Sequence, residues 1–214
     1  MNIIFCHDHR LNFLLQRSKN SFLRYNPKAK IYEITKDELG LLNEFTQELC
    51  GFAHVSKACF LRLLIPKLFP QLDRALYVDV DTLCLGNIDE FYNADFENNY
   101  LMAVRGIKYS DIQANQLEIP YYVNSGVLLF NIPLMNKENY FQQIKDKWKG
   151  AVGKQHPFSA DESIINWVFH NKIKLVNEKW NYCYNRDYGD RAVKSPKILH
   201  FVGQDKSAML TYRY

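Results

Sequence analysis

The chain has 214 residues, of which 47% are hydrophobic and 14% aromatic, and its formal net charge is +4 at pH 7. This apolar content excludes a disordered chain and suits one globular domain over residues 1–214. No apolar run reaches the roughly 18 residues that span a membrane, the opening MNIIFCHDHR lacks the apolar core of a secretory signal peptide, and five cysteines without a CxxC pair favour reduced thiols in a cytoplasmic protein.

Apolar runs typical of strands alternate along the chain with segments of helical spacing. In chain order we expect a strand over 2–6, a helix over 11–24, a strand over 29–34, a helix over 56–69, strands over 75–80, 100–104 and 123–131, helices over 135–149 and 161–170, and strands over 172–176 and 197–202. Pro66 is expected to kink or shorten the second helix. The alternation predicts an α/β fold with a mainly parallel central sheet flanked by helices.

Polar clusters follow three of the predicted strands, at residues 6–10, 79–81 and 200–206. In sheets of this kind, ligands bind at the carboxyl ends of the strands. The three clusters therefore predict one shared ligand site at this edge of the central sheet.

Asp79 and Asp81 directly follow the apolar run ALYV. Alternation along a strand would place both carboxylates on one face, where like charges repel. A divalent cation bound by their oxygens would remove that repulsion. Two other interpretations stay open: exposed acids in a turn, and an aspartate-nucleophile phosphotransferase, although Leu83 stands where its DxDx[TV] motif has Thr or Val.

The last predicted strand ends in the pattern H-x-x-G-x-x-K, formed by His200, Gly203 and Lys206. A lone histidine at a strand end is more often structural, but beside two aspartates it would complete a mixed ligand set that suits Mn²⁺ or Mg²⁺. Gly203 would let the backbone approach a phosphate, and the Lys206 ammonium would neutralise one. A diphosphate bound to such a metal would be a stabilised leaving group.

Two further motifs place polar residues next to apolar elements. Asn124 and Ser125 precede the run VLLF and are typical either of a tight turn or of a site that binds sugar hydroxyls. Asp161 and Glu162 begin a predicted helix, where carboxylates complement the helix dipole even without a role in a reaction.

The excess positive charge lies in a basic C-terminal segment, residues 179–214. This segment carries seven basic and three acidic side chains, whereas those of residues 1–178 balance. It fits a solvated tail, a phosphate-bearing ligand or an anionic membrane surface. The small number of basic residues and the lack of a nucleic-acid-binding module argue against a nucleic-acid partner.

The stretches FLRLLIPKLFPQLDRALYVDVDTL, VNSGVLLFN, DESIINW and LHFVGQDK, in this order, resemble glycosyltransferase family 8 over residues 1 to about 206. The resemblance implies the GT-A fold of nucleotide-diphospho-sugar transferases. It also implies a metal-dependent, retaining transfer of a hexose from a UDP-sugar to a saccharide acceptor, which can be lipid-linked, in lipopolysaccharide or cell-surface polysaccharide synthesis. Such an enzyme would act in the cytoplasm, in peripheral contact with the inner membrane surface.

The resemblance also assigns roles to individual residues. It implies metal ligation by Asp79, Asp81 and His200, nucleoside contact by Asp8, donor contact near the sugar by Arg62, donor-sugar contact by Asn124 and Asp161, and diphosphate contact by Gly203 and Lys206. The family usually has Gln at the position of Glu162. We therefore expect Asp161 and Glu162 at the reaction centre, with Glu162 either a nucleophile or a hydrogen-bonding partner of a donor hydroxyl.

A competing class is a protein that binds a nucleotide sugar without transferring it. Two departures from the family motivate it: Ser207 and Ala208 replace a common Pro-Trp pair, and the stretch between about 35 and 55 is shorter than usual. UDP release from UDP-glucose or UDP-galactose distinguishes the two classes, because an idle binder releases none. A phosphotransferase would instead release phosphate from a phosphoester, with Asp79 as the nucleophile.

Overall fold

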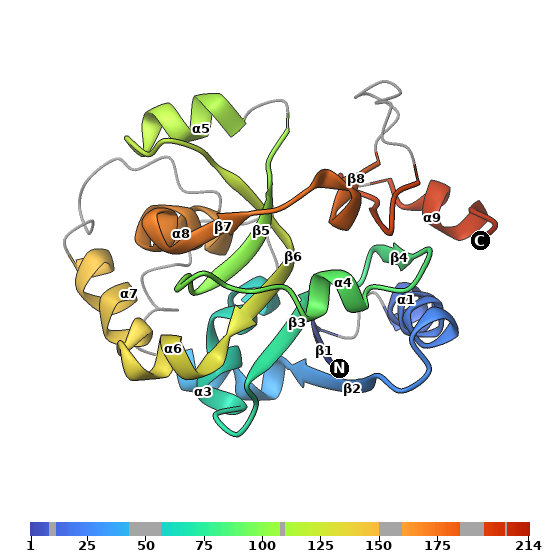
Figure 1. Cartoon of the computed structure of the whole chain (residues 1–214), viewed down its shortest axis with the longest axis horizontal. Coiled ribbons are helices and arrows are strands. Elements are labelled where there is room, and N and C mark those ends of the chain that lie inside the picture. Colours follow the sequence, from blue (N-terminus) through green and yellow to red (C-terminus); the bar gives the residue numbers. More distant parts are fainter. Residues whose placement is uncertain (9–11, 43–56, 108–109, 150–159, 185–194, 204) are drawn as a thin grey trace.

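The structure is a computed structural model that describes residues 1–8, 12–42, 57–107, 110–149, 160–184, 195–203 and 205–214. A six-stranded central sheet runs through the molecule in the order β2-β1-β3-β6-β5-β7 (Figure 1). Its strands are β1 (Asn2–His7), β2 (Lys30–Thr35), β3 (Arg74–Val78), β5 (Leu101–Arg105), β6 (Val123–Asn131) and β7 (Ile173–Leu175). The β1–β2, β1–β3 and β5–β7 pairings are parallel, so the expectation of a mainly parallel sheet is confirmed.

Strand β6 is the exception, since it runs antiparallel to both of its neighbours, β3 and β5. Its register with β3 includes the pair Val78↔Val127. The amino end of β6 therefore lies beside the carboxyl end of β3. This reversal brings the polar start of β6 to the edge of the sheet at which ligands are expected to bind.

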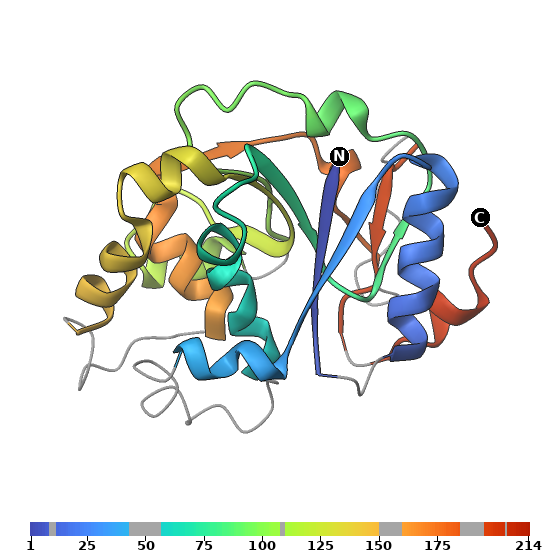
Figure 2. The same ribbon diagram turned by 90° about the horizontal axis from the view of Figure 1, so that it is seen from below.

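Helices cover both faces of the central sheet (Figure 2). Alternation along β3 sends Ala75 and Tyr77 to one face and Leu76 and Val78 to the other. The first face packs against the 3₁₀ helix η2 (Lys57–Leu64) and helices α3 (Ile65–Leu68), α6 (Ile132–Lys137), α7 (Tyr140–Lys149) and α8 (Ala160–Phe169). The second face packs against α1 (Asn12–Tyr25), α4 (Asp89–Tyr92) and the 3₁₀ helix η4 (Glu178–Trp180). The core thus consists of two apolar clusters separated by the sheet.

A second, three-stranded sheet packs beside α1. Its strands are, in spatial order, β4 (Thr82–Cys84), β9 (Ile198–His200) and β8 (Tyr182–Cys183). The strand expected over 197–202 is therefore real but shorter, and its expected place in the central sheet is wrong. It leaves that sheet because β4, which follows β3 after a tight turn, offers it an antiparallel partner in the register Thr82↔His200.

Helix α9 (Ser207–Thr211) lies beside α1. Arg17 of α1 donates to the carbonyls of Met209, at 2.8 Å, and of Tyr212, and these bonds tie the last described residues to α1. The other short elements are the 3₁₀ helices η1 (Lys36–Leu42) and η3 (His170–Lys172) and helix α5 (Ser110–Gln116).

Two predicted helices differ in detail from the structure. The helix expected over 56–69 is η2 followed by α3, and residue 56 lies outside the described part of the chain. Pro66 lies in the first turn of α3 instead of ending a helix. Proline is tolerated there because backbone N–H groups in the first turn make no hydrogen bond within the helix, so its missing N–H costs nothing. The helix expected over 135–149 is two helices, α6 and α7, interrupted at Asn139, whose φ is 51°.

Within the described residues, no helix is both long and apolar enough to cross a membrane. Cys6, Cys59, Cys84 and Cys183 are free thiols, as their spacing predicts. Cys50 lies among the residues that are not described.

Candidate metal and donor site

The two aspartates lie in the turn that connects β3 to β4. Strand β3 ends at Val78, so the expectation that strand alternation aligns Asp79 and Asp81 is wrong. Thr82 closes the turn, since its N–H and its hydroxyl both donate to the Asp79 carbonyl, at 3.2 and 2.7 Å. The turn buries Asp81 and leaves the Asp79 side chain 25% exposed. Asp81 is therefore not an exposed turn acid.

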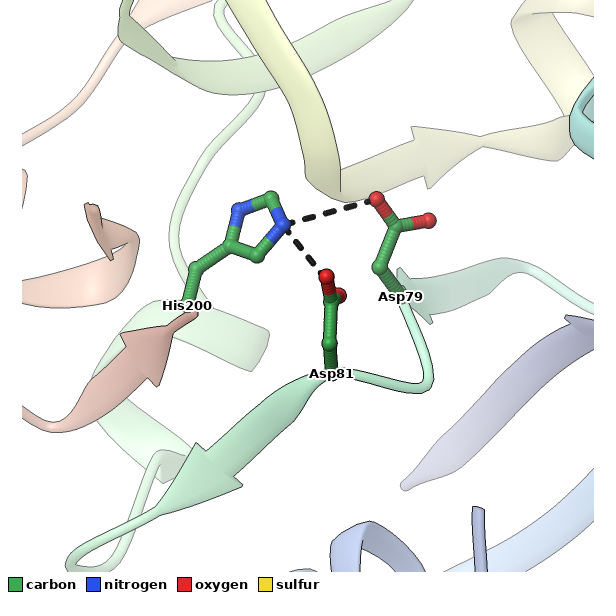
Figure 3. Close-up of side chains that lie close together, drawn as sticks. All are labelled: Asp79, Asp81 and His200. Carbon is green, nitrogen blue, oxygen red and sulfur yellow. Dashed lines mark ion pairs between the residues drawn. The ribbon is translucent and has the colours of Figure 1, made fainter. Parts of the chain in front are cut away.

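His200 meets the aspartates because β9 pairs with β4. The register Thr82↔His200 places the imidazole next to the turn. Its Nε2 lies 3.6 Å from Asp79 Oδ2 and 3.3 Å from Asp81 Oδ1 (Figure 3). The ligand atoms of this triad lie within 4.8 Å of one another, a spacing that suits one metal ion. Burial opposes charge on the imidazole, but the Asp81 carboxylate outweighs burial and raises the pKa of His200.

Gly126 has no side chain, and the imidazole of His200 occupies the space that a Cβ atom at this position would fill. A Cβ atom at this position would lie 2.1 Å from His200 Cε1 and 2.9 Å from Asp79 Oδ2, both well inside van der Waals contact. The Gly126 carbonyl also accepts the Asp79 N–H at 2.8 Å, which extends the pairing of β3 with β6 to the first aspartate. The sequence NSG at the start of β6 therefore serves the triad by placing a residue without a side chain beside it.

Arg62, from η2, is 5% exposed and connects three acidic or polar groups. Its guanidinium lies 3.2 Å from Asp79 Oδ1 and 2.8 Å from Asp161 Oδ2, and it donates to the Ser125 carbonyl at 2.6 Å. The guanidinium also covers the Tyr77 ring, and the Tyr77 hydroxyl donates to Asp79 Oδ1. Arg62 and Tyr77 thus hold one oxygen of Asp79 and leave Oδ2 facing the imidazole.

Helix α8 is docked onto the first residue of β6 by one side chain. Asn166 accepts the Val123 N–H at 2.7 Å and donates to the Val123 carbonyl at 2.9 Å, as a neighbouring strand would. Because Asn166 lies one turn after Glu162, this docking carries Asp161 and Glu162 to the start of β6.

Glu162 is tied to the residues that precede Gly126. Its Oε2 accepts the Ser125 N–H at 2.8 Å, the Ser125 hydroxyl at 3.1 Å and the Asn124 amide at 3.2 Å. Burial raises the pKa of Glu162, and burial also raises the pKa of Asp161 in spite of the adjacent Arg62 guanidinium.

Carboxylates outnumber cations around the triad. The contacts of this region join four carboxylates and two cations: Asp79, Asp81, Asp161, Glu162, Arg62 and Lys206. When all of these are ionised and His200 is neutral, as a metal-binding imidazole must be, two negative charges remain, which is the charge that one divalent cation compensates. Asp81 Oδ1 is buried and accepts no hydrogen bond from the described residues. The donor set, two carboxylates and an imidazole, therefore fits a divalent cation such as Mn²⁺ or Mg²⁺.

An open pocket of about 220 Å³ adjoins the aspartates. The predicted site residues that line it are Asp8, Arg62, Asp79, Asp81 and Lys206. Lys206 donates to Asp81 Oδ2 and, at 2.6 Å, to the Phe201 carbonyl. Gly203 lies between His200 and Lys206 with a φ of 94°, a conformation that a side chain would strain.

The geometry also involves Tyr77, Asn166 and Asn181, whose amide oxygen lies 3.1 Å from His200 Nδ1, and the sequence-based site contains none of these residues. Tyr77 lies two residues before Asp79, so strand alternation could have placed it beside that carboxylate. Asn166 lies four residues after Glu162 and could have been found by helical spacing. Asn181 has no such signal, because its partner His200 lies 19 residues away in the sequence.

A family model and several relatives match this chain. The model described as Glycosyl transferase family 8 matches residues 1–207. Glycosyltransferase GlyE of Streptococcus pneumoniae is 25% identical over 95% of this chain and 56% of its own length. The lipopolysaccharide 1,3-galactosyltransferase of Salmonella typhimurium is 30% identical over 70% of this chain and 48% of its own length. The chain thus spans about half the length of these two relatives.

Solved structures match the fold. The galactosyltransferase LgtC in complex with donor and acceptor sugar analogs has a TM-score of 0.78, with 18% identity over 95% of this chain and 87% of that chain. An active-site Gln-to-Glu mutant of LgtC has a TM-score of 0.79 at the same identity. These similarities confirm the GT-A fold, and the family model covers almost the whole sequence. The chain belongs to glycosyltransferase family 8.

Proposed function

We propose that the protein transfers a hexose from a UDP-sugar to a saccharide acceptor, with retention at the anomeric carbon and with a divalent metal. The observation that carries this proposal is the convergence of Asp79 and Asp81, from the turn between β3 and β4, with His200, from β9, beside an open pocket. Family membership supports the reaction class. Relatives named lipopolysaccharide 1,3-galactosyltransferase and 1,2-glucosyltransferase support a hexose as the transferred group.

The triad and the loop after it would bind the donor diphosphate. Asp79 Oδ2, Asp81 Oδ1 and His200 Nε2 would hold Mn²⁺ or Mg²⁺. A bound cation of this kind neutralises the diphosphate and stabilises UDP as the leaving group. Lys206, already at the pocket, would contribute a further positive charge to the diphosphate, and Gly203 would allow its close approach to the backbone.

The remaining predicted residues would bind the other parts of the donor. Asp8 lines the pocket and would contact the nucleoside. Asn124, Ser125 and Asp161 would bind hydroxyls of the hexose, and Arg62 would hold Asp79 and Asp161 in place beneath them.

We propose that Glu162 binds a donor hydroxyl and is not the nucleophile. Its Oε2 already accepts hydrogen bonds from Ser125 and Asn124, so we assign the contact with the donor to Oε1. Hydrogen bonds to a carboxylate also lower its nucleophilicity, because they stabilise the charge that would attack. Retention would then come from attack on the face that the departing diphosphate leaves.

We further propose a role in lipopolysaccharide or cell-surface polysaccharide synthesis, on a lipid-linked acceptor, at the cytoplasmic face of the inner membrane. The names of the relatives support the pathway class, and the basic C-terminal segment supports an anionic surface. Within that segment, Lys179 pairs with Glu90 at 3.0 Å and Lys206 with Asp81, whereas Arg213 is exposed. A membrane contact would therefore involve Lys197 and Arg213, together with the basic residues of 185–194, which lie outside the described part.

A UDP-release assay tests this function. The protein is incubated with UDP-glucose or UDP-galactose, with Mn²⁺ or with EDTA. We expect UDP release from one of the two donors in Mn²⁺ and none in EDTA. A rise in melting temperature with UDP but no release would identify an idle binder. Release of phosphate from a phosphoester would instead support the phosphotransferase.

A further inference from the structure

Asn181 connects the metal ligand His200 to the residues expected to bind the hexose. It is 2% exposed and directly follows η4. Its Oδ1 lies 3.1 Å from His200 Nδ1, and its Nδ2 donates to Asn124 Oδ1 at 2.8 Å. Asn124 in turn donates to Glu162. A chain of side-chain amides, from the buried Asn181 to the half-buried Asn124, therefore runs between the two halves of the site.

The direction of these hydrogen bonds follows from one backbone group. The Gly126 N–H can only donate, and it donates to the Asn124 side chain at 3.0 Å. The accepting atom is therefore the Asn124 amide oxygen, so the group of Asn181 that also faces this oxygen must be its NH₂. The amide oxygen of Asn181 then faces His200 Nδ1, which must carry a proton to donate.

A protonated Nδ1 leaves the lone pair of the neutral imidazole on Nε2. This atom points at the gap between Asp79 Oδ2 and Asp81 Oδ1. We propose that Asn181 is a positioning residue that holds His200 in the Nδ1–H tautomer and so presents Nε2 to a divalent cation. The inference rests on the proposed metal site and goes beyond it by naming the residue that orients its imidazole ligand.

Cys183 is a further polar neighbour of the imidazole, besides Asn181 and the two aspartates. It is the register partner of His200 in the β8–β9 pair. A thiol sulfur is a weak hydrogen-bond acceptor, whereas an amide oxygen is a strong one. The tautomer is therefore assigned to Asn181.

Two substitutions separate the bonds that Asn181 makes. Asn181→Asp keeps an oxygen for His200 Nδ1–H but sets a second oxygen against Asn124 Oδ1. Asn181→Leu removes the amide oxygen that faces His200 and the NH₂ group that faces Asn124, and it keeps a side chain of similar volume. Loss of a partner that orients a metal ligand typically costs about 10–100-fold in affinity. We therefore expect Asn181→Leu to lose Mn²⁺ affinity by about that factor, and Asn181→Asp to keep most of it while turnover falls.

Mn²⁺ affinity is measured by calorimetry, and imidazole ¹⁵N shifts are recorded on wild-type protein with Zn²⁺, a diamagnetic ion that binds imidazole nitrogen. We expect a protonated Nδ1 and a metal-bound Nε2 on His200. The matched control is Asn26→Leu, which removes another buried amide that accepts the Ile88 N–H and donates to the Phe22 carbonyl. It should lose stability without losing Mn²⁺ affinity.

Wild-type Mn²⁺ affinity in Asn181→Leu, or metal bound to His200 through Nδ1, would overturn the inference. If Asn181→Leu does not fold, Asn181→Asp and the wild-type ¹⁵N shifts decide it. Wild-type protein that binds neither Mn²⁺ nor Zn²⁺ would instead show that the proposed metal site has failed.

Discussion

Adding one methyl group at Gly126 tests whether the triad depends on close packing. In Gly126→Ala the new Cβ would lie 2.1 Å from His200 Cε1 and 2.6 Å from His200 Nδ1. Non-bonded carbon atoms sit about 3.5–4.0 Å apart, so the imidazole or β6 must move by more than an ångström. His200 has little room to move, because it is 4% exposed and its strand is paired on both sides, with β4 and β8.

We expect two effects of this substitution. Overpacking a buried site costs about 1–3 kcal/mol of the free energy of unfolding, so the melting temperature should fall while the protein still folds. A displacement of about 1 Å at a reacting centre costs about 100-fold in rate, so UDP release should fall by about that factor. Mn²⁺ affinity should fall with it, since His200 would no longer face both aspartates. Thermal unfolding, Mn²⁺ calorimetry and the UDP-release assay measure the three quantities.

Gly40→Ala is the matched control, because a Cβ atom there would meet nothing within 4 Å. It should leave melting temperature, Mn²⁺ affinity and UDP release close to those of the wild type. Gly126→Ala protein that binds Mn²⁺ with wild-type affinity would refute the reasoning, because the imidazole could not then lie where the structure places it.

Three other changes test separate parts of the account. Asp81→Ala removes a proposed metal ligand and should abolish Mn²⁺-dependent UDP release; full transfer that resists EDTA would contradict the proposed metal site. Glu162→Gln keeps an oxygen for the Ser125 N–H, so the measured kcat should stay near that of the wild type, whereas complete loss of turnover would support a nucleophilic carboxylate. Hydrogen bonds from Lys19 and His7 lower the pKa of Glu33, so this carboxylate stabilises the fold above its ordinary pKa of 4.5 and loses that contribution as the pH falls through its lower folded pKa. The melting temperature of Glu33→Gln should therefore lie below that of the wild type at about pH 7, and the gap should close as the pH falls through the lowered folded pKa; a gap that stays constant into strong acid would contradict this assignment.

The central sheet was predictable because each of its strands can be recognised from its own short run of apolar residues. Runs such as NIIFC and ALYV are apolar on both faces, as strands covered by helices on each side must be. The aspartate pair and His200 were predictable for a similar reason. Each directly follows an apolar run, where a charged or polar side chain is costly to bury unless it has a partner, so its presence there indicates a role. Local sequence thus identified the side chains of the triad.

Pairing between distant segments was not predictable in the same way. Nothing in the residues around His200 shows that β9 leaves the central sheet to pair with β4, yet this pairing brings the imidazole to the aspartates. Asp79 and Asp81 were expected on one strand face, but a turn closed by Thr82 aligns them instead. Asn181 and Gly126 take their roles from neighbours that only the folded chain brings together.

The central claim is that Asp79, Asp81 and His200 bind one divalent cation together with the diphosphate of a sugar nucleotide. Crystals of the protein soaked with Mn²⁺ and UDP test it most directly, through the anomalous scattering of manganese. The account predicts one strong anomalous peak between the three side chains, in contact with the UDP phosphates. Bound UDP with no manganese at that position, or manganese held elsewhere, would contradict it.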